Sequence, residues 1–431
     1  TANFVPNPAV AAAFPGAENF ADDNYDNWVP YSGGINVGEG YIVRPQSGYG
    51  QPGGIFNYTY NQGTLNNGVV NFNVIYNTPG PLPADNKNAS PNIFANPYAS
   101  AISADDFITA NAMVDEVYFW EHLTPPSSTL PGAGAMNFHM QDISMYNLMG
   151  GTQAANDLIG TTTPNGVIST GQGFGIKANA AGTAVFNNSM RLTSGNTTLR
   201  GPDVNRERIW LKISNTAFDM QNTTLIGFSD NATAGLDSGY DSRRLATVLS
   251  LYSHLEDGTQ QLGIQSREAF ESGIKVPLGF SSQLEGEWEY SLSIADLEGA
   301  NLSEATVYLM DNLLGTVVNL SEAPYVFRSI EGTFHGRFTV MFEYEPTLGI
   351  GGDVLQQINM FPNPTEHVVN IVSPKAIIQS IAVYDLQGRK ILMEQHQSNN
   401  VQIDFSDLQS SVYFVEIRTE SGTVSKRVVR K

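Results

Sequence analysis

The chain has 431 residues, of which 41% are hydrophobic and 10% aromatic, so it is long and apolar enough to form two or three folded domains. It contains no cysteine, which excludes disulfides, thiolate metal sites and cysteine nucleophiles. The formal net charge of −20 opposes contact with phosphate backbones, and no apolar run approaches the roughly 20 residues of a membrane-spanning helix, so we expect neither nucleic-acid binding nor a transmembrane segment.

The sequence begins at Thr1 with neither a methionine nor an apolar leader, which predicts that an upstream signal peptide has been cleaved.

The first sixty residues are rich in aromatic side chains, asparagine and glycine. Flat rings beside amide groups are typical of sugar-binding surfaces, so a carbohydrate-binding patch is one interpretation, and burial of the rings in a core is the other. The rings belong to Tyr25, Trp28, Tyr31, Tyr41, Tyr49, Phe56, Tyr58 and Tyr60.

The body of the chain is predicted to be all-β, a β-sandwich or jelly-roll-like fold of one or two domains. Ser103 stands before a short apolar run and predicts a helix that ends near Asn111. Strands are expected at Val114–Trp120 and at Gly171–Lys177, where glycines allow a bulge. Further runs of strand length follow at the spacing of a sandwich. They cover residues 208–213, 224–228, 249–252, 275–280, 290–294 and 337–342.

Basic residues become denser near residues 193–208, and this change suggests a domain boundary. We therefore predict an N-terminal β-rich body domain over residues 1–200 and a second β-sandwich body domain over 201–345. Pro346 stops the preceding strand, and three glycines follow within four positions at 349–352, so residues 346–356 are predicted to be a flexible linker. Residues 357–431 form the last predicted domain.

Two acidic clusters in the body are candidate Ca²⁺ sites, because Ca²⁺ prefers hard oxygen ligands in loops. One combines Asp22, Asp23 and Asp26, and the other combines Asp230 with Asn231, Asp237 and Asp241. Neither cluster fits the twelve-residue Ca²⁺ loop pattern, and the alternative is that these side chains cap turns by bonding their own backbone. Acids of this kind also serve glycosidases, which use two carboxylates across a cleft.

Enzyme signatures are mostly absent. The six histidines are scattered, and no His-x-x-x-His spacing places two metal ligands on one helix face. A Gly-x-Ser-x-Gly elbow is also missing, although catalytic triads need no fixed motif. We therefore expect a non-enzymatic protein without a cofactor, apart from the Ca²⁺ candidates.

The tail, residues 357–431, differs from the body in charge and pattern. Residues 353–431 carry eight acidic and eight basic side chains, which leaves 34 acidic and 14 basic residues in the body. Pro362 and Pro364 favour an extended, non-helical arm. Gly388 can adopt positive φ in a tight hairpin whose amides the Asp385 side chain can bond. Alternation around Tyr413 indicates a half-buried strand, so the tail is predicted to be a small Ig-like antiparallel β-sandwich.

Three spaced motifs in the tail, Pro-Asn-Pro at 362–364, Asp-x-x-Gly-basic at 385–389 and Leu-x-x-x-x-Tyr at 408–413, resemble the type A C-terminal sorting domain of the Bacteroidetes type IX (Por) secretion system. Ser410 and Ser411 stand where that family usually has a glycine. The resemblance implies docking on the type IX translocon and an outer-membrane shuttle barrel. The signal residues it implies are Pro362, Asn363, Pro364, Asp385, Gly388, Arg389, Lys390, Tyr413, Lys426 and Lys431.

The body over about residues 42–344 resembles the region found upstream of sorting domains in flavobacterial cell-surface proteins, as in segments 96–101 and 169–174. Both resemblances imply export to the periplasm by the signal peptide, then across the outer membrane to the cell surface or medium. Removal of the tail and attachment to lipopolysaccharide are further implications. For the body we expect an adhesin-like role in surface attachment or gliding, and the alternative is a polysaccharide-binding or polysaccharide-degrading protein.

Overall fold

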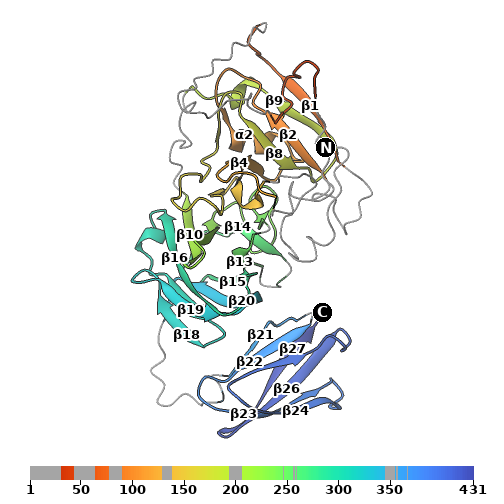
Figure 1. Cartoon of the computed structure of the whole chain (residues 1–431), viewed down its shortest axis with the longest axis vertical. Helices are drawn as coiled ribbons and strands as arrows, with labels where there is room; N and C mark the ends of the chain where they lie inside the picture. Colours follow the sequence, from red (N-terminus) through yellow and green to blue (C-terminus); the bar gives the residue numbers. More distant parts are fainter. Residues whose placement is uncertain are drawn as a thin grey trace. The chain divides into compact units, whose positions relative to one another are not determined.

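The computed structural model describes residues 31–42, 64–76, 90–128, 138–193, 206–245, 247–255, 258, 260–344, 355, 358–365 and 367–431. The described part is built from strands, with one α-helix and short 3₁₀ turns (Figure 1), so the all-β prediction is confirmed. Two compact units divide the chain: residues 1–204 with 237–246, and residues 205–236 with 247–431. No helix among the described residues is long and apolar enough to cross a membrane.

The N-terminal unit contains a five-stranded sheet in the order β2-β8-β4-β5-β6 and two-stranded sheets β1-β9 and β3-β7. Its core gathers the rings of Phe94, Phe107, Phe174 and Phe186, which meet mostly edge to face. The strands are β1 Val70–Val74, β2 Pro91–Ala95, β3 Ile102–Ser103, β4 Val117–Trp120, β5 Ile143–Asn147, β6 Gly150–Thr152, β7 Val167–Ile168, β8 Gly173–Lys177, β9 Gly182–Phe186 and β12 Ser242–Arg243, with turns η1 Met140–Asp142 and η2 Asn188–Met190.

The helix predicted after Ser103 is confirmed as α2, Ala104–Ala110. The Ser103 hydroxyl accepts a hydrogen bond from the amide of Asp106 at 3.0 Å, and Asn111 closes the helix. The strand expected from Val114 begins only at Val117, because the Val114 amide donates to the carbonyl of Asn111 in a turn that follows the helix. Likewise the strand expected from Gly171 begins at Gly173, since Gly171 has a φ of 69° in a tight turn.

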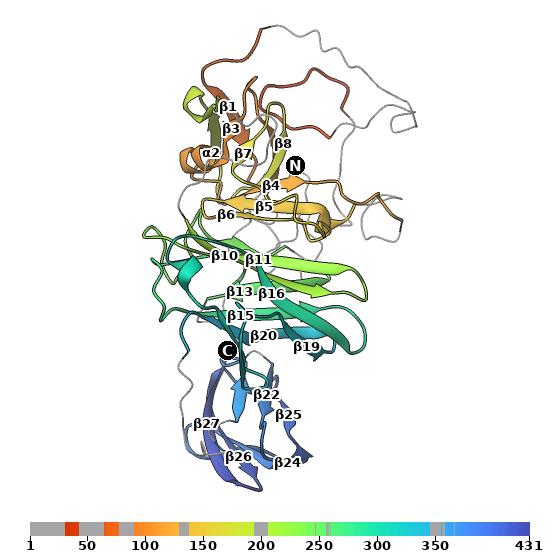
Figure 2. The same ribbon diagram turned by 90° about the vertical axis from the view of Figure 1, so that its left-hand side faces the viewer.

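The C-terminal unit begins with a sandwich whose strands hydrogen-bond in the order β18-β17-β20-β15-β13-β14-β11-β10-β16-β19 (Figure 2). The sheet curls on itself, since Phe280 of β15 and Phe327 of β19 touch at 5.4 Å between ring centroids. The strands are β10 Glu207–Asn215, β11 Met220–Phe228, β13 Leu249–His254, β14 Gln261–Arg267, β15 Lys275–Ser282, β16 Trp288–Glu298, β17 Tyr308–Asp311, β18 Thr316–Asn319, β19 Tyr325–Ser329 and β20 Gly332–Met341, with turn η3 Leu302–Glu304.

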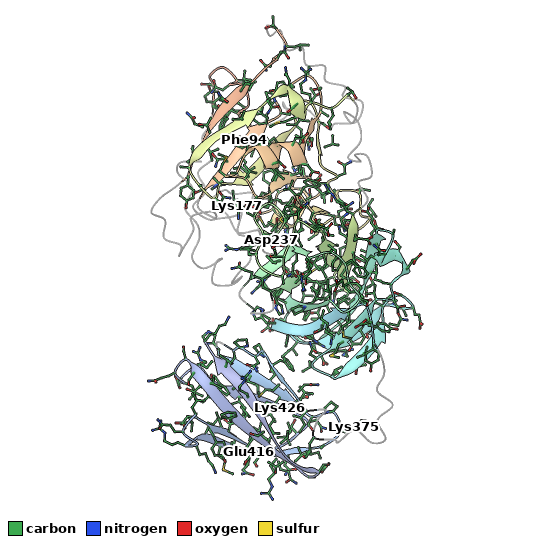
Figure 3. The ribbon with its side chains drawn as sticks, turned by 180° about the vertical axis from the view of Figure 1, so that it is seen from behind. Phe94, Lys177, Asp237, Lys375, Glu416 and Lys426 are labelled. Atoms are coloured by element: carbon green, nitrogen blue, oxygen red, sulfur yellow. The ribbon has the colours of Figure 1, made fainter. Side chains whose placement is uncertain are left out.

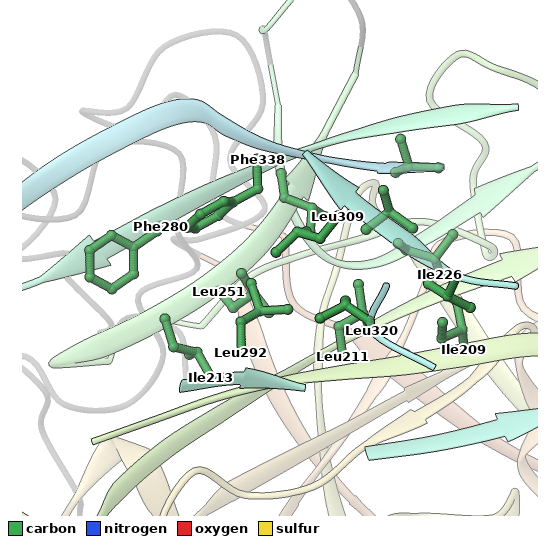
Figure 4. Packing of buried hydrophobic residues seen from close by; sticks show 14 of the residues in the cluster. Ile209, Leu211, Ile213, Ile226, Leu251, Phe280, Leu292, Leu309, Leu320 and Phe338 are labelled. Atoms are coloured by element: carbon green, nitrogen blue, oxygen red, sulfur yellow. The ribbon is translucent and has the colours of Figure 1, made fainter. Parts of the chain in front are cut away.

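A continuous apolar core fills this sandwich (Figure 4). Alternate residues of β10, Ile209, Leu211 and Ile213, are fully buried, as a period of two requires for a strand with one inward face. They pack with Leu251 and Leu292 from other strands of the same sheet. Because these strands supply the buried apolar residues of the core, the later body strands could be predicted from apolar runs in the sequence.

The tail forms a second, smaller sandwich of two antiparallel sheets, as predicted. A three-stranded sheet has the order β21-β22-β25, and a four-stranded sheet has the order β24-β23-β26-β27. Ile371, Ile381, Val415 and Ile417 belong to the core between them and are fully buried. The strands are β21 Asn359–Phe361, β22 Val368–Val372, β23 Ile378–Tyr384, β24 Lys390–Ser398, β25 Asn400–Asp404, β26 Ser411–Thr419 and β27 Gly422–Arg430.

Candidate functional site

Asn363 of the Pro-Asn-Pro motif covers part of an open sheet edge in the tail. Asn363 Nδ2 donates to the carbonyl of Arg427 at 2.8 Å, and Asn363 Oδ1 accepts from the amide of Val429 at 2.9 Å. β27 is an edge strand, and unpaired edge groups invite uncontrolled strand pairing. The amide side chain thus takes the place of a neighbouring strand. The extended arm expected through Pro364 is wrong beyond Phe361, because residues 362–364 form a bend that brings Asn363 to this edge.

Thr365 continues this contact and was missed in the sequence. Its amide donates to the carbonyl of Val429 at 2.8 Å, and its own carbonyl accepts from the amide of Lys431 at 2.9 Å. Its hydroxyl donates to the carbonyl of Val368 at 2.7 Å, and the residue is 1% exposed. The available signal was the β-branched residue that directly follows Pro364.

The hairpin between β23 and β24 is organised by Asp385, as the sequence predicted. One carboxylate oxygen accepts from the amides of Gln387 and Arg389, both at 2.9 Å, and the other accepts from Arg389 Nε at 2.7 Å. Gly388 has a φ of 76°, which the turn requires. Desolvation opposes the charge on Asp385, but the hydrogen bonds from Arg389 and Gln387 outweigh it and lower the pKa of this carboxyl.

Tyr413 is a buried structural residue at the start of β26. Its hydroxyl donates to the carbonyl of Gln409 at 2.8 Å, and its ring meets Phe405 edge to face. A tyrosine that bonds the backbone a few residues upstream fixes the corner of many Ig-like sandwiches. Ser410 and Ser411, the departure from the family pattern, lie within this corner, and β26 begins at Ser411.

The basic residues at the end of the tail lie in two different environments. Lys426 alternates with Arg427 on β27 and faces the core side, half-buried, so desolvation lowers the pKa of its ammonium group (Figure 3 labels this residue). Lys431 is exposed, and its backbone amide bonds Thr365. Among the signal residues implied by the resemblance, the structure exposes Asn363, Arg389, Lys390 and Lys431 and buries Tyr413.

The structure does not bring the second acidic cluster together. Asp230 is exposed and belongs to the C-terminal unit, whereas Asp237 and Asp241 belong to the N-terminal unit. The buried Asp241 carboxylate accepts from the amide of Asp237 at 2.7 Å, which is the turn-capping alternative. Within the described ranges, no group of three or more His, Asp or Glu side chains is placed to hold a metal ion. Asp22, Asp23 and Asp26 lie outside those ranges, as do residues 346–356 of the predicted linker apart from Leu355.

Among the described residues of the N-terminal unit, exposed aromatic rings occur at two places. Tyr31 and Tyr41 stack at 5.3 Å, while the other aromatic residues singled out before residue 61 lie outside the described residues. The second place is the end of β4, where Trp120 meets Phe138 at 4.4 Å and His122 at 5.0 Å. Trp120 and Phe138 are 38% and 39% exposed, large fractions for such rings. We call Trp120, His122 and Phe138 the ring cluster.

Glu121, which follows Trp120 in the chain, interacts electrostatically with Asp157, and the pKa values of these two carboxyl groups are shifted in opposite directions. Burial raises the pKa of Glu121, which also accepts a hydrogen bond from the Ser144 hydroxyl. Burial opposes the charge of Asp157, but hydrogen bonds from the Thr162 amide and hydroxyl and from the amides of Ile159 and Gly160 lower its pKa. Asp157 is 3% exposed, and because its carboxylate accepts from these backbone amides it stabilises the turn that follows it.

Comparisons with known proteins match both parts of the chain. Residues 359–431 match the family described as secretion system C-terminal sorting domain. Among curated proteins, no match is found. A solved structure of PorZ, a surface component of the type IX secretion system of Porphyromonas gingivalis, is 14% identical with a TM-score of 0.17, over 36% of this chain and 21% of that one. A polysaccharide lyase is 8% identical with a TM-score of 0.14, over 52% and 40%.

This chain spans less than half of either protein. The sorting domain makes the protein a cargo of the type IX secretion system, exported to the cell surface or the medium. Residues 3–342 match the domain of unknown function DUF8693, so the chain belongs to that family, with a secretion system C-terminal sorting domain attached.

Proposed function

We propose that the body is a non-enzymatic, adhesin-like module used in surface attachment or gliding, and that the translocon and the shuttle barrel recognise the tail directly. The ring cluster supports the adhesive role. Solvent-exposed tryptophan and phenylalanine rings are costly to leave in water and are suited to stacking on sugars or packing against a protein ligand.

The export half of the proposal is tested in a type IX host with and without a working translocon. Deletion of residues 359–431 is expected to leave a folded body in the periplasm, because the tail core is a separate cluster of side chains. The intact chain is expected outside only when the translocon works. Export of the deleted chain would refute recognition of the tail.

The adhesive half is tested on the exported chain with a glycan array and an attachment assay. Trp120→Ala and Phe138→Ala are expected to reduce attachment by about tenfold, as loss of aromatic anchors does at interfaces. Leu236→Ala changes an exposed apolar residue that belongs to the C-terminal unit and not to the ring cluster, and it serves as the control. Equal attachment by all variants would exclude the ring cluster.

A polysaccharide-degrading enzyme is the second candidate, supported by the opposite pKa shifts of Glu121 and Asp157. It ranks lower because the Asp157 carboxylate is already occupied by backbone amides. Release of reducing ends from a surface polysaccharide, abolished by Glu121→Gln, would favour the enzyme over the adhesin.

A further inference from the structure

The tail presents an exposed row of side chains across all four strands of its larger sheet. In the strand register, Lys390 of β24 pairs with Tyr384 of β23, Tyr384 with Phe414 of β26, and Phe414 with Arg427 of β27. Cross-strand partners on one face of a sheet lie within direct contact distance. We call these four residues the outer row. It places two aromatic rings between two cations.

The outer row faces away from the core of the tail. Val383, Tyr413 and Val415, the chain neighbours of Tyr384 and Phe414, are buried in that core, and successive side chains of a strand point to opposite faces. Phe414 is accordingly 41% exposed, and Lys390 and Arg427 are exposed. The Lys390 ammonium lies 5.8 Å from the centre of the Tyr384 ring and 3.7 Å from Met393 Sδ.

Motifs far apart in the sequence meet at this row. The Asp385 hairpin joins Tyr384 to Lys390, and its hydrogen bonds fix the direction in which both strands leave the turn. At the other end, Asn363 binds the carbonyl of Arg427 and holds that part of the edge strand. The signal residues Asp385 and Asn363 therefore position the row instead of forming the contact surface themselves.

We propose that the outer row is the surface by which the tail docks on a protein of the type IX machinery, and that this partner presents carboxylates to Lys390 and Arg427 and apolar side chains to Tyr384 and Phe414. The inference rests on the proposed recognition of the tail. Glu416, exposed two residues from Phe414 on the same face, would repel an anionic lipid surface (Figure 3 labels Glu416). A protein partner can match this mixed pattern of charges, which favours a protein over lipopolysaccharide.

The test uses the full chain in a type IX host. Lys390→Glu with Arg427→Glu, and separately Phe414→Ser, are expected to lower the exported fraction by about tenfold, because charge reversal and loss of an aromatic anchor act at the centre of the contact. Arg418→Glu is the matched control, since Arg418 is exposed on the same face but pairs with Ser380 and Thr423, outside the row. Protease resistance of the retained protein checks folding.

A photoreactive phenylalanine analogue at position 414 of the full chain identifies the molecule that contacts the outer row, because it forms a covalent cross-link with whatever lies against it. A cross-link to an outer-membrane component of the translocon or to the shuttle barrel supports the proposal. Cross-links only to lipopolysaccharide or to a second copy of the chain overturn it. Normal export of the row variants also overturns it, and if deletion of residues 359–431 still blocks export in the same host, the proposed recognition of the tail stands while the outer row is excluded.

Discussion

The side-chain amide of Asn363 pairs with the backbone at Val429 as a neighbouring strand would: its oxygen accepts from the Val429 amide at 2.9 Å, and its nitrogen donates to the carbonyl of Arg427, two positions earlier in the strand. A single residue of the Pro-Asn-Pro motif therefore satisfies two backbone groups on an edge strand. This arrangement gives the motif a physical role that is separate from any contact with a partner.

Replacing Asn363 with alanine is expected to destabilise this edge by about 0.5–1.5 kcal/mol for each hydrogen bond lost. Hydrogen exchange of a peptide covering residues 422–431 should become faster, since the Val429 amide loses its acceptor. Asn363→Asp keeps that acceptor but replaces the donor to Arg427 with a carboxylate oxygen that repels the carbonyl, so the exchange rate of the peptide should fall between those of wild type and Asn363→Ala. Equal exchange in all three proteins would contradict the pairing.

The Asp385 hairpin is expected to weaken in acid. Because hydrogen bonds lower the pKa of Asp385 in the folded state, the unfolded chain binds its proton first, so the stabilisation is complete above the unfolded pKa of about 4 and is lost as pH falls through the folded pKa. Asp385→Asn should therefore be less stable than wild type at pH 7, and the difference should shrink as pH falls through the folded pKa.

This pH dependence can be measured by unfolding the full chain in urea at each pH and labelling it with a brief pulse of hydrogen exchange. The exchange of a peptide covering residues 381–393 then reports the unfolded fraction. Asp407→Asn is the control, because Asp407 is exposed and its side chain makes no hydrogen bond with the rest of the described chain. Some acid sensitivity should survive in Asp385→Asn, since hydrogen bonds from Ser406 also lower the pKa of Asp404. A difference between wild type and Asp385→Asn that is constant from pH 7 to pH 3 would argue against the role of the carboxylate.

Tyr413→Phe is expected to cost about 1 kcal/mol, since the Gln409 carbonyl loses its donor while the ring stays packed on Phe405. Tyr413→Ala should cost about 3–5 kcal/mol, because a large buried ring is removed. Tyr384→Phe is the control, as its hydroxyl has no hydrogen-bond partner within the described ranges. Hydrogen exchange over residues 405–417 reports the loss, and a null result for Tyr413→Phe would mean that the corner bond contributes nothing.

Local patterns in the sequence predicted the fold class, the capped helix after Ser103 and the Asp385 hairpin, because each depends on residues within a few positions of one another. The destination of Asn363 was not predictable, since its partners lie 64 and 66 positions away and depend on strand register. The outer row was not predicted either, because strand register alone brings its four residues side by side. The ring cluster was missed because Trp120 ends an apolar run in β4 whose other three residues are buried, and the sequence does not say which end of a strand is exposed.

The sandwich of the body buries a charged pair that the sequence did not reveal. Arg337 and Asp311 are 1% exposed each, with Arg337 Nη2 at 3.4 Å from Asp311 Oδ2. The guanidinium lies 4.3 Å from the centre of the Phe327 ring, and its Nε and Nη1 have no partner in the part of the chain that the structure describes. Burial lowers the pKa of Arg337, and Asp311 opposes that effect. Asp311 is better satisfied, since it also accepts from the Tyr325 hydroxyl and the Leu313 amide, both at 2.9 Å.

The two partners should therefore respond unequally to substitution. Asp311→Asn leaves the buried guanidinium uncompensated and is expected to cost about 3–5 kcal/mol. Arg337→Met should cost less, because the thioether chain can fill the space among the phenylalanine rings and Asp311 keeps its other donors. Urea unfolding followed by fluorescence of Trp210 and Trp288 measures both, with Arg328→Met as a surface control worth about 0–1 kcal/mol. A larger loss for Arg337→Met than for Asp311→Asn would show that the cation stabilises the sandwich through its aromatic contacts and not through the ion pair.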